Sequence, residues 1–318
     1  MADMVFSGVT FSGGYSISLP PPPSYKAIFG YGYATGGTYV SMTNLVSNTG
    51  VVAIDTTGVG TARSSLAAAG YGTDKAIFGY GDTGAVTAIT NLVSSSGVVA
   101  TNTTGVGTAR SVLSAATYGT DKSIFGYGSP NSGSTQVSMT NLVSNTGVVA
   151  TDTTGVGTAR QGLAAAGYGS TGQAIFGYGT NATPALSMTN LVSNTGVVAA
   201  DTTGVGTARS NLAAAGYGTD KAIFGYGGNS AGTSVSMTNL VSNTGVVATD
   251  TTGVGTARQA LASAGYSTDK AIFGYGYTTW FNPQSMTNLV SNTGVVATDT
   301  TGVGTVRAYL AAASYGAA

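Results

Sequence analysis

The sequence predicts an all-β protein built from six copies of one unit. The pentapeptide Ile-Phe-Gly-Tyr-Gly occurs six times, and its phenylalanine stands at Phe29, Phe78, Phe125, Phe176, Phe224 and Phe273. Successive copies are 47 to 51 residues apart, close to the roughly 40 to 50 residues of one four-stranded β-propeller blade. The repeat therefore predicts a six-bladed β-propeller of four-stranded antiparallel blades.

The first half of a unit reads as a hairpin of two strands. Arg63 to Tyr71 is followed by the turn Gly72 to Lys75, and then by the apolar run Ala76 to Tyr80. Short apolar runs separated by Gly, Thr and Asp are typical of antiparallel strands. We expect the alanine-rich first strand to line the crowded axis of the ring. Phe78 and Tyr80 should then fill the wider space between blades.

The second half of a unit predicts two more strands. Ser41 to Ser47 and Val51 to Asp55 flank a turn that contains Asn48, Thr49 and Gly50. Their length is that of ordinary strands, and no segment of the chain carries a helical pattern long enough to compete. Each unit should therefore contribute four strands.

The two ends of the repeat array are complementary. The array begins at Lys26 on a second strand, whereas the chain ends on Val306 to Gly316, a first strand with no second strand after it. If these strands pair, the C-terminal strand closes the ring, while an open solenoid would need caps instead. We expect residues 24 to 318 to form the propeller. A trimeric β-prism or a β-solenoid is the alternative.

Residues 1 to 23 differ from the repeats and predict an extended N-terminal arm. Val5 to Phe11 and Tyr15 to Leu19 alternate as strands do, and Pro20 to Pro23 form a polyproline spacer. Such an arm can pair with other structural protein chains by strand addition. The alternative is a strand that packs on its own propeller.

Three features recur in the same order from about Lys26 to Gly316. They are an apolar strand ending in glycine (residues 77–79), a Thr-Asn segment before a hairpin, and an arginine that opens the next unit, as at Arg63 and Arg110. This pattern resembles the kelch-type β-propeller repeat. The glycine pair of that family is here interrupted by Tyr80, and a valine replaces its usual tryptophan. The resemblance implies the fold and no activity.

Composition excludes several kinds of chemistry. The chain has no His, no Cys and no Glu, and its 11 Asp balance 11 Lys plus Arg. Thiol and imidazole catalysis, disulfides and zinc sites are therefore excluded, and a neutral chain is a poor ligand for nucleic acid. We expect a protein that is not an enzyme and has no cofactor. No apolar run is long enough for a membrane span, and the N-terminus lacks the features of a signal peptide.

Most charges recur at the same position in successive units. An arginine opens each unit, and an aspartate ends the fourth segment in five units, with Asn102 in the sixth. These residues are Arg63, Arg110, Arg160, Arg209, Arg258, Arg307, Asp55, Asp152, Asp201, Asp250 and Asp299. A charge repeated in every blade is expected to be structural and to pair at the blade junctions. One carboxylate per unit is also too few for calcium, so we expect no metal.

The loop between the second and third strands carries nearly all the variation in length between units. Its first and last copies hold aromatic residues absent from the others, with Asn282 and Gln284 beside them in the last copy, and ring closure would make these two loops neighbours. We expect a ligand-binding site formed by Tyr33, Tyr39, Tyr277, Trp280, Phe281 and Asn282. Such residues suit stacking on a sugar or a protein hot spot. The alternative is that Trp280 only covers an apolar gap.

Two classes of function fit these features. One is a structural display protein, tethered by its arm, that presents variable loops to a glycan or a host surface. The arm and the near-identical repeats resemble accessory capsid or tail-fibre proteins of tailed bacteriophages, which implies a virion or extracellular surface location. The other class is a soluble carbohydrate-binding lectin.

Overall fold

The computed structural model describes residues 25–279 and 282–316, and every regular element in this part of the chain is a β-strand. The strands form small antiparallel sheets, most of them with three strands. The all-β prediction is therefore confirmed. No helix in the described ranges is long and apolar enough to cross a membrane. The predicted arm, residues 1 to 23, lies outside the described residues.

One sheet shows how the repeat folds. β3 (Ala67–Tyr71), β4 (Lys75–Gly79) and β5 (Thr90–Val93) pair in that order, with Ala69 opposite Ile77 and Ile77 opposite Leu92. Four further sheets repeat this arrangement. They consist of β6 (Ser114–Tyr118), β7 (Lys122–Gly126) and β8 (Thr140–Val143); β9 (Ala164–Tyr168), β10 (Gln173–Gly177) and β11 (Thr189–Val192); β13 (Ala213–Tyr217), β14 (Lys221–Gly225) and β16 (Thr238–Val241); and β17 (Ala262–Tyr266), β18 (Lys270–Gly274) and β19 (Thr287–Val290).

The remaining large sheet joins the two ends of the repeat array. β1 (Lys26–Ala34) pairs with β2 (Thr38–Val46) on one side and with β21 (Ala311–Tyr315) on the other. The short strand β20 (Arg307–Ala308) continues the pairing along β1. The first and last repeat strands therefore share one sheet, as the complementary ends of the array predict. Elsewhere, β12 (Arg209–Ser210) and β15 (Gly228–Asn229) form a separate short pair.

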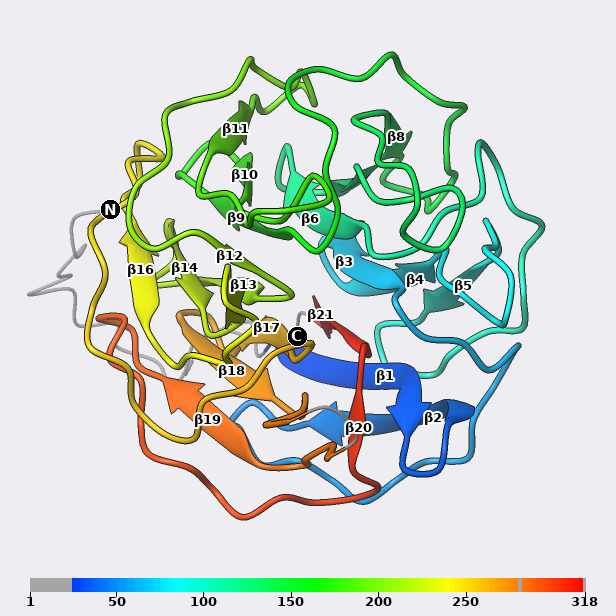
Figure 1. The fold of residues 1–318 in the computed structure, drawn as a ribbon. Helices are drawn as coiled ribbons and strands as arrows, with labels where there is room; N and C mark the ends of the chain where they lie inside the picture. The colour runs from blue at the N-terminus through cyan, green and yellow to red at the C-terminus, as the bar shows by residue number, and fades with distance from the viewer. Residues whose placement is uncertain (1–24, 280–281, 317–318) are drawn as a thin grey trace, which may run out of the picture.

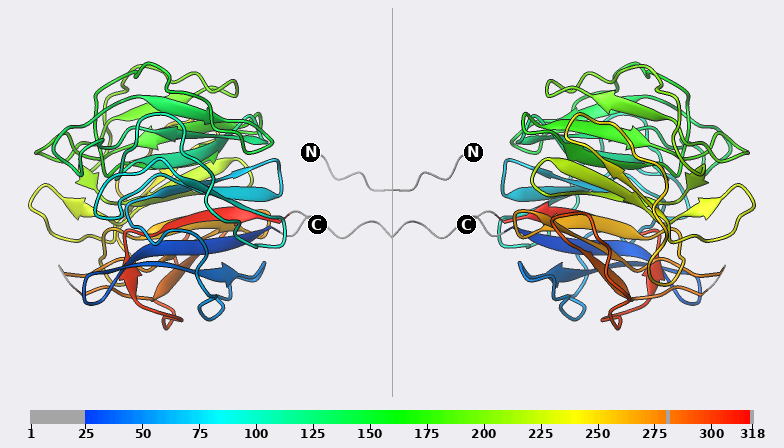
Figure 2. Two further views of the ribbon diagram at one scale, coloured as in Figure 1. Left: turned by 90° about the vertical axis from the view of Figure 1, so that its right-hand side faces the viewer. Right: turned by 90° about the vertical axis from the view of Figure 1, so that its left-hand side faces the viewer.

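The innermost strands follow one another around a common centre (Figure 1). β3 contacts β6, and the contacts continue in the order β9, β13, β17 and β21, after which β21 contacts β3. Seen from the side, the strands run from one face of the molecule toward the other (Figure 2). The sheets thus succeed one another in a cycle of contacts that returns to its start.

Two cycles of backbone hydrogen bonds accompany this order. At one end, six residues with φ of 52° to 61° are linked from N–H to C=O by bonds of 2.7 to 2.9 Å; they are Ser65, Val112, Gly162, Asn211, Ala260 and Tyr309. The N–H of Ser65 donates to the carbonyl of Tyr309, which completes the cycle. At the hairpin end, equivalent bonds run from turn to turn, and Gly316 N–H donates to Asp74 O at 2.7 Å. Both cycles therefore pass through the C-terminal segment.

Aromatic side chains fill the space between neighbouring sheets. The Tyr80 ring lies 5.1 Å from the Phe125 ring of the next sheet, and Phe78 lies 5.1 Å from Tyr31 of the preceding one. All four side chains are fully buried. Gly79 makes this packing possible, because a Cβ there would lie 2.7 Å from Cζ of Phe125. The expected role of Phe78 and Tyr80 is thus the observed one.

The prediction of four strands per sheet is wrong. The segment predicted to be the fourth strand, which begins at Val51 and is called the outer segment below, makes only isolated bridges. Examples are Val46 with Val52 and Thr43 with Thr56. The two bridged residues on β2 are three positions apart, whereas their two partners on the outer segment are four positions apart. The outer segment therefore has one extra residue, which interrupts the hydrogen-bond ladder as in a β-bulge. At this point a side chain bonds to the outer segment, since Nδ2 of Asn44 donates a hydrogen bond to Ala53 O at 2.9 Å. The outer segment follows the sheet without forming a regular strand.

The first strand is also shorter than predicted. Arg63 to Leu66 precede β3, because Ser65 adopts φ of 54° and breaks the extended conformation. This turn places Ser65 in the hydrogen-bond cycle at the axis and leaves Arg63 to point into the junction between sheets.

Candidate recognition site

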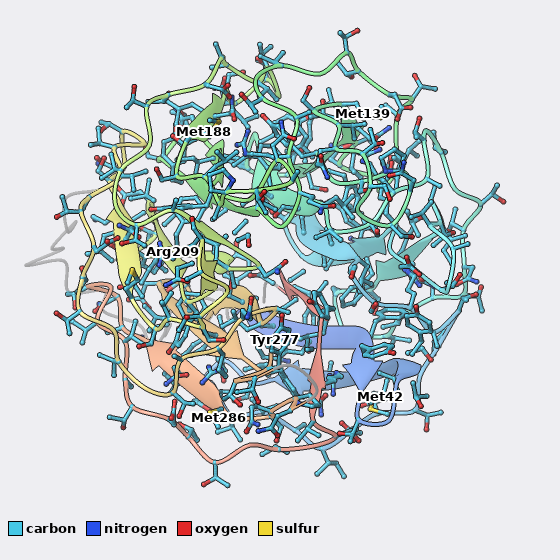
Figure 3. The ribbon with its side chains drawn as sticks, in the orientation of Figure 1. Met42, Met139, Met188, Arg209, Tyr277 and Met286 are labelled. Atoms are coloured by element: carbon cyan, nitrogen blue, oxygen red, sulfur yellow. The ribbon has the colours of Figure 1, made fainter. Side chains whose placement is uncertain are left out.

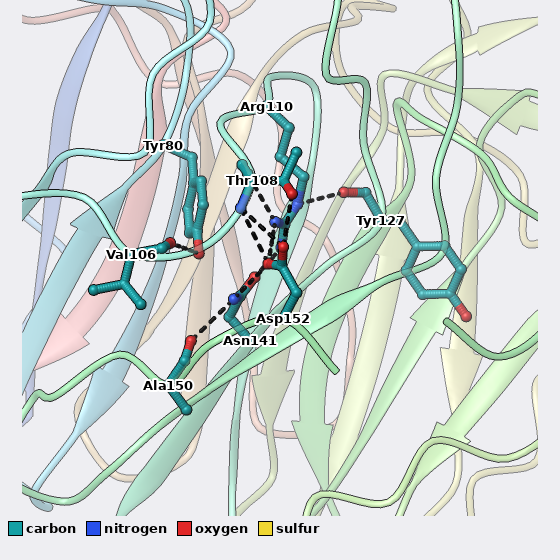
Figure 4. A network of polar contacts seen from close by, with 8 residues as sticks. All are labelled: Tyr80, Val106, Thr108, Arg110, Tyr127, Asn141, Ala150 and Asp152. Carbon is teal, nitrogen blue, oxygen red and sulfur yellow. Dashed lines mark hydrogen bonds and ion pairs between the residues drawn. The ribbon is translucent and has the colours of Figure 1, made fainter. Parts of the chain in front are cut away.

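The repeated arginines lie in buried junctions between sheets (Figure 4). Nε of Arg110 donates to Tyr127 O at 2.9 Å, and Nη2 donates to Oδ1 of Asn141 at 2.6 Å. The guanidinium carbon lies 4.5 Å from the centre of the Tyr80 ring, which belongs to the preceding sheet. Cation–π stacking therefore links the two sheets, while the hydrogen bonds remain within one unit.

Asp152 completes this junction. Its carboxylate accepts hydrogen bonds from N–H and Oγ1 of Thr108, the latter at 2.6 Å, and lies 3.7 Å from Nη1 of Arg110. Burial acts to raise the pKa of Asp152, but hydrogen bonds from Thr108 and Asn141 and the charge of Arg110 outweigh it, so the pKa lies below its usual value. Ion pairs at the same position join Arg160 to Asp201, Arg258 to Asp299 and Arg307 to Asp55.

The arginine of each junction keeps its charge. Burial lowers the pKa of Arg110, but nearby Tyr80 and Asp152 act in the opposite direction, and an arginine remains charged in proteins. Among residues 25–279 and 282–316, no three acidic side chains gather where they could hold a metal ion.

A different environment occurs between the β1–β2 loop and the β18–β19 loop. A cavity of about 260 Å³ lies there, with walls that include Tyr33, Gly36, Tyr277, Pro283 and Tyr309. β1 brings Tyr33 opposite Ala308, while a bridge with Gln259 fixes Tyr277. Tyr277 lies nearer the centre of the molecule than Met42, in β2, and Met286, the residue before β19 (Figure 3). The first and last variable loops are thus neighbours, as predicted.

Two tyrosines form the inner wall of this cavity. The hydroxyls of Tyr277 and Tyr309 are 3.2 Å apart and their ring centres 5.8 Å apart. Burial, with a contribution from Tyr309, raises the pKa of Tyr277 far above its ordinary value. Both phenols therefore remain neutral at physiological pH and provide aromatic surface together with hydroxyl groups.

A second pair of tyrosines leads away from the cavity. The rings of Tyr33 and Tyr39 are 5.3 Å apart, edge to face, and the Tyr39 hydroxyl donates to Oδ1 of Asp82 at 3.3 Å. Partial burial and the carboxylate of Asp82 raise the pKa of Tyr39. Asp82 belongs to the β4–β5 loop, so a hydrogen bond connects the tyrosine pair to a third variable loop.

The structure brings together some of the predicted ligand-binding residues. Tyr33 and Tyr277 line one cavity, and Tyr39 packs on Tyr33 without lining it. Asn282 caps its own loop, because its Nδ2 donates to Oγ1 of Thr278 at 3.2 Å. Trp280 and Phe281, the other two predicted residues, lie outside the described residues.

Sequence reasoning missed Tyr309 and Pro283. Tyr309 stands at the axis, where the other five units have Ser65, Val112, Gly162, Asn211 and Ala260. Its departure from the small residues of this set is a signal that could have identified it. Pro283 carries no such signal, since every unit differs in that part of the loop.

Another cavity, of about 350 Å³, lies at the hairpin end of the axis. Its walls include Tyr25, Thr73, Thr120 and Thr219. Most of its lining comes from positions that recur in several units, in contrast to the loop cavity. The walls of the hairpin-end cavity are therefore similar in each unit, whereas the residues that line the loop cavity differ from unit to unit.

Comparison with protein-family models finds no match to this chain, and a search of curated proteins finds no matching relative. The candidate site therefore rests on its geometry.

Proposed function

We propose that the protein is a kelch-like six-bladed β-propeller that acts as a non-enzymatic recognition protein. The cycle of contacts between inner strands, the two cycles of hydrogen bonds and the sheet shared by β1 and β21 support the propeller architecture. Such an architecture holds variable loops on a rigid frame, which is where binding residues commonly occur.

The ligand that fits best is a glycan, and the aromatic cavity between the β1–β2 and β18–β19 loops carries this proposal. Its walls combine flat apolar rings with the hydroxyls of Tyr277 and Tyr309. A sugar presents an apolar face and a rim of hydroxyls, so it complements both features. The residues of this wall also depart from the repeat, whereas the frame around them is nearly copied from unit to unit.

Substitution of Tyr33 tests this function. Tyr33→Ala removes one wall of the cavity and should weaken glycan binding by about 1 to 3 kcal/mol, the usual cost of losing an aromatic anchor. Thr180→Ala is the matched control, since Thr180 holds the same position in another unit. Glycan-array binding and the melting temperature should be measured on both variants. A Tyr33→Ala protein that is stable and binds as well as the unaltered chain would remove this cavity from consideration.

Trp280→Ala tests the same loop at a position predicted from the sequence. If Trp280 stacks on the glycan, the variant should lose affinity by about 1 to 3 kcal/mol while its melting temperature stays the same. If Trp280 only covers an apolar gap, the melting temperature should fall and affinity should not.

The proposed setting is the surface or fibre of a virion, with residues 1 to 23 as the tether to other structural chains; a soluble lectin is the alternative. Tyr25, the first described residue, lines the hairpin-end cavity, at the opposite end of the strands from the variable loops. An arm that starts there can attach the protein and leave its loops facing outward.

Removal of the arm distinguishes these two settings. A chain that begins at Ser24 should remain folded and bind glycan but no longer co-purify with assembled particles. If the unshortened protein never occurs in particles and the shortened chain binds glycan equally well, the lectin alternative is correct. Unfolding of the shortened chain would show that the arm is part of the fold.

A further inference from the structure

Asp82 is the only charged residue in the six variable loops, residues 33–41, 82–88, 129–138, 180–187, 228–236 and 277–285. It stands directly after the Phe-Gly-Tyr-Gly motif, at the position that Tyr277 and Tyr33 hold in the two preceding units. Three successive units thus place a non-repeated residue at the same point. Tyr277, Tyr33 and Asp82 follow one another around the loop face.

The carboxylate of Asp82 connects its own loop to β2 and to the β7–β8 loop. Oδ1 accepts hydrogen bonds from the hydroxyl of Tyr39, near the start of β2, at 3.3 Å and from its own loop at Gly84 N–H, 2.7 Å away. Oδ2 accepts from Oγ of Ser132, in the β7–β8 loop, at 2.8 Å. An ionised carboxylate offers about four acceptor positions, and these three bonds leave acceptor capacity for a ligand hydroxyl.

We propose that the aromatic cavity and Asp82 are two ends of one extended binding surface, and that its ligand is an uncharged oligosaccharide. This inference rests on the proposed glycan-binding function. Tyr33 lines the cavity, Tyr39 packs against Tyr33, and Asp82 bonds to Tyr39. One sugar fills the cavity, the next lies along the tyrosine pair, and a hydroxyl of a further sugar donates to Oδ2 of Asp82.

The charge of this surface selects against anionic sugars. Asp82 would repel a carboxylated or sulfated glycan, and no loop supplies a lysine or arginine to offset it. The repeated arginines cannot do so, because they are fully buried in the junctions. A neutral chain with donor hydroxyls suits both ends of the surface.

The test measures binding of glucose and N-acetylglucosamine oligomers of one to four units, with galacturonic acid oligomers of the same lengths. The unaltered protein should bind neutral trimers at least about tenfold more tightly than monomers. Asp82→Asn keeps the size of the side chain and should reduce trimer affinity about tenfold, the usual effect of one charge-assisted hydrogen bond. Its monomer affinity should not change.

Ser132→Ala and Asp152→Asn complete the design. Ser132→Ala removes one partner of Asp82 and should reduce trimer affinity less than Asp82→Asn does. Asp152→Asn removes a negative charge from a junction and should change neither the monomer affinity nor the trimer affinity. This control separates the local effect of the Asp82 charge from the effect of the net charge of the protein. Melting temperatures show whether each variant is folded.

The outcomes are distinct. Equal affinity for monomers and trimers, an unaffected Asp82→Asn protein, or preference for galacturonic acid oligomers would overturn the extended neutral site while leaving glycan binding in place. Absence of binding to every oligomer would overturn the proposed function and this inference together.

Discussion

Asn102 occupies the position that an aspartate holds in the other five units, and its contacts show what the junction requires. Its Oδ1 accepts from Thr61 N–H at 3.1 Å, and its Nδ2 donates to Oγ1 of Thr61 at 2.7 Å. Arg63 still donates to Oδ1 of Asn91 at 2.8 Å. The hydrogen bonds of the junction therefore persist without the negative charge.

This comparison predicts unequal costs for the two partners of a junction. Asp152→Asn recreates the natural Asn102 arrangement, in which the hydrogen bonds of the junction persist, and should cost about 1 kcal/mol or less in the free energy of unfolding. Arg110→Ala should cost about 3 to 5 kcal/mol, because it leaves Asn141 and Tyr127 O buried without their donor. Urea unfolding of both variants measures the difference, and equal costs would contradict this description.

The buried tyrosines of the Phe-Gly-Tyr-Gly motif predict loss of stability in alkali. Burial raises the pKa of Tyr80, Tyr226 and Tyr275 to about 12, against about 10 in an unfolded chain. The unfolded state therefore releases protons first, so stability is intact below pH 10 and falls as the pH rises toward 12. Tyr80→Phe removes one such group. Its melting temperature should fall less steeply over this range, and an identical decline would contradict the assignment.

At the scale of elements, the close approach of neighbouring sheets depends on glycine at the end of the middle strand. Gly79→Ala should cost about 1 to 3 kcal/mol through overpacking against Phe125. Gly70→Ser is a suitable control, since Thr117 and Ser314 hold the equivalent position in other sheets. Thermal unfolding checks both, and equal melting temperatures would show that Phe125 moves aside freely.

The inner and middle strands could be predicted because their apolar runs and turns recur six times. The outer strand was predicted wrongly, since a side-chain amide such as that of Asn44 takes over ladder hydrogen bonds, and no pattern of apolar residues shows this. Tyr33 and Tyr277 were found as departures from the repeat. The hydrogen bond between Tyr39 and Asp82 was not predicted, because it depends on the distance between two side chains from different units.

At the scale of the whole molecule, the first and last units of the repeat array are held together by non-covalent contacts. β20 and β21 supply the strand next to β1, and Tyr309 and Gly316 complete the two hydrogen-bond cycles at the axis. Arg307 also donates to Oδ1 of Asn44 at 2.6 Å, across the same junction. These links between the first and last strands all come from residues 307–316.

Thermal unfolding of a chain that lacks Val306 to Ala318 tests the proposed closed propeller most directly. We predict that the melting temperature falls by more than about 10 °C, since several kcal/mol of contacts are lost. Addition of a peptide with the sequence of residues 306–318 should restore much of that loss. A shortened chain that unfolds cooperatively at the temperature of the unaltered protein would contradict ring closure.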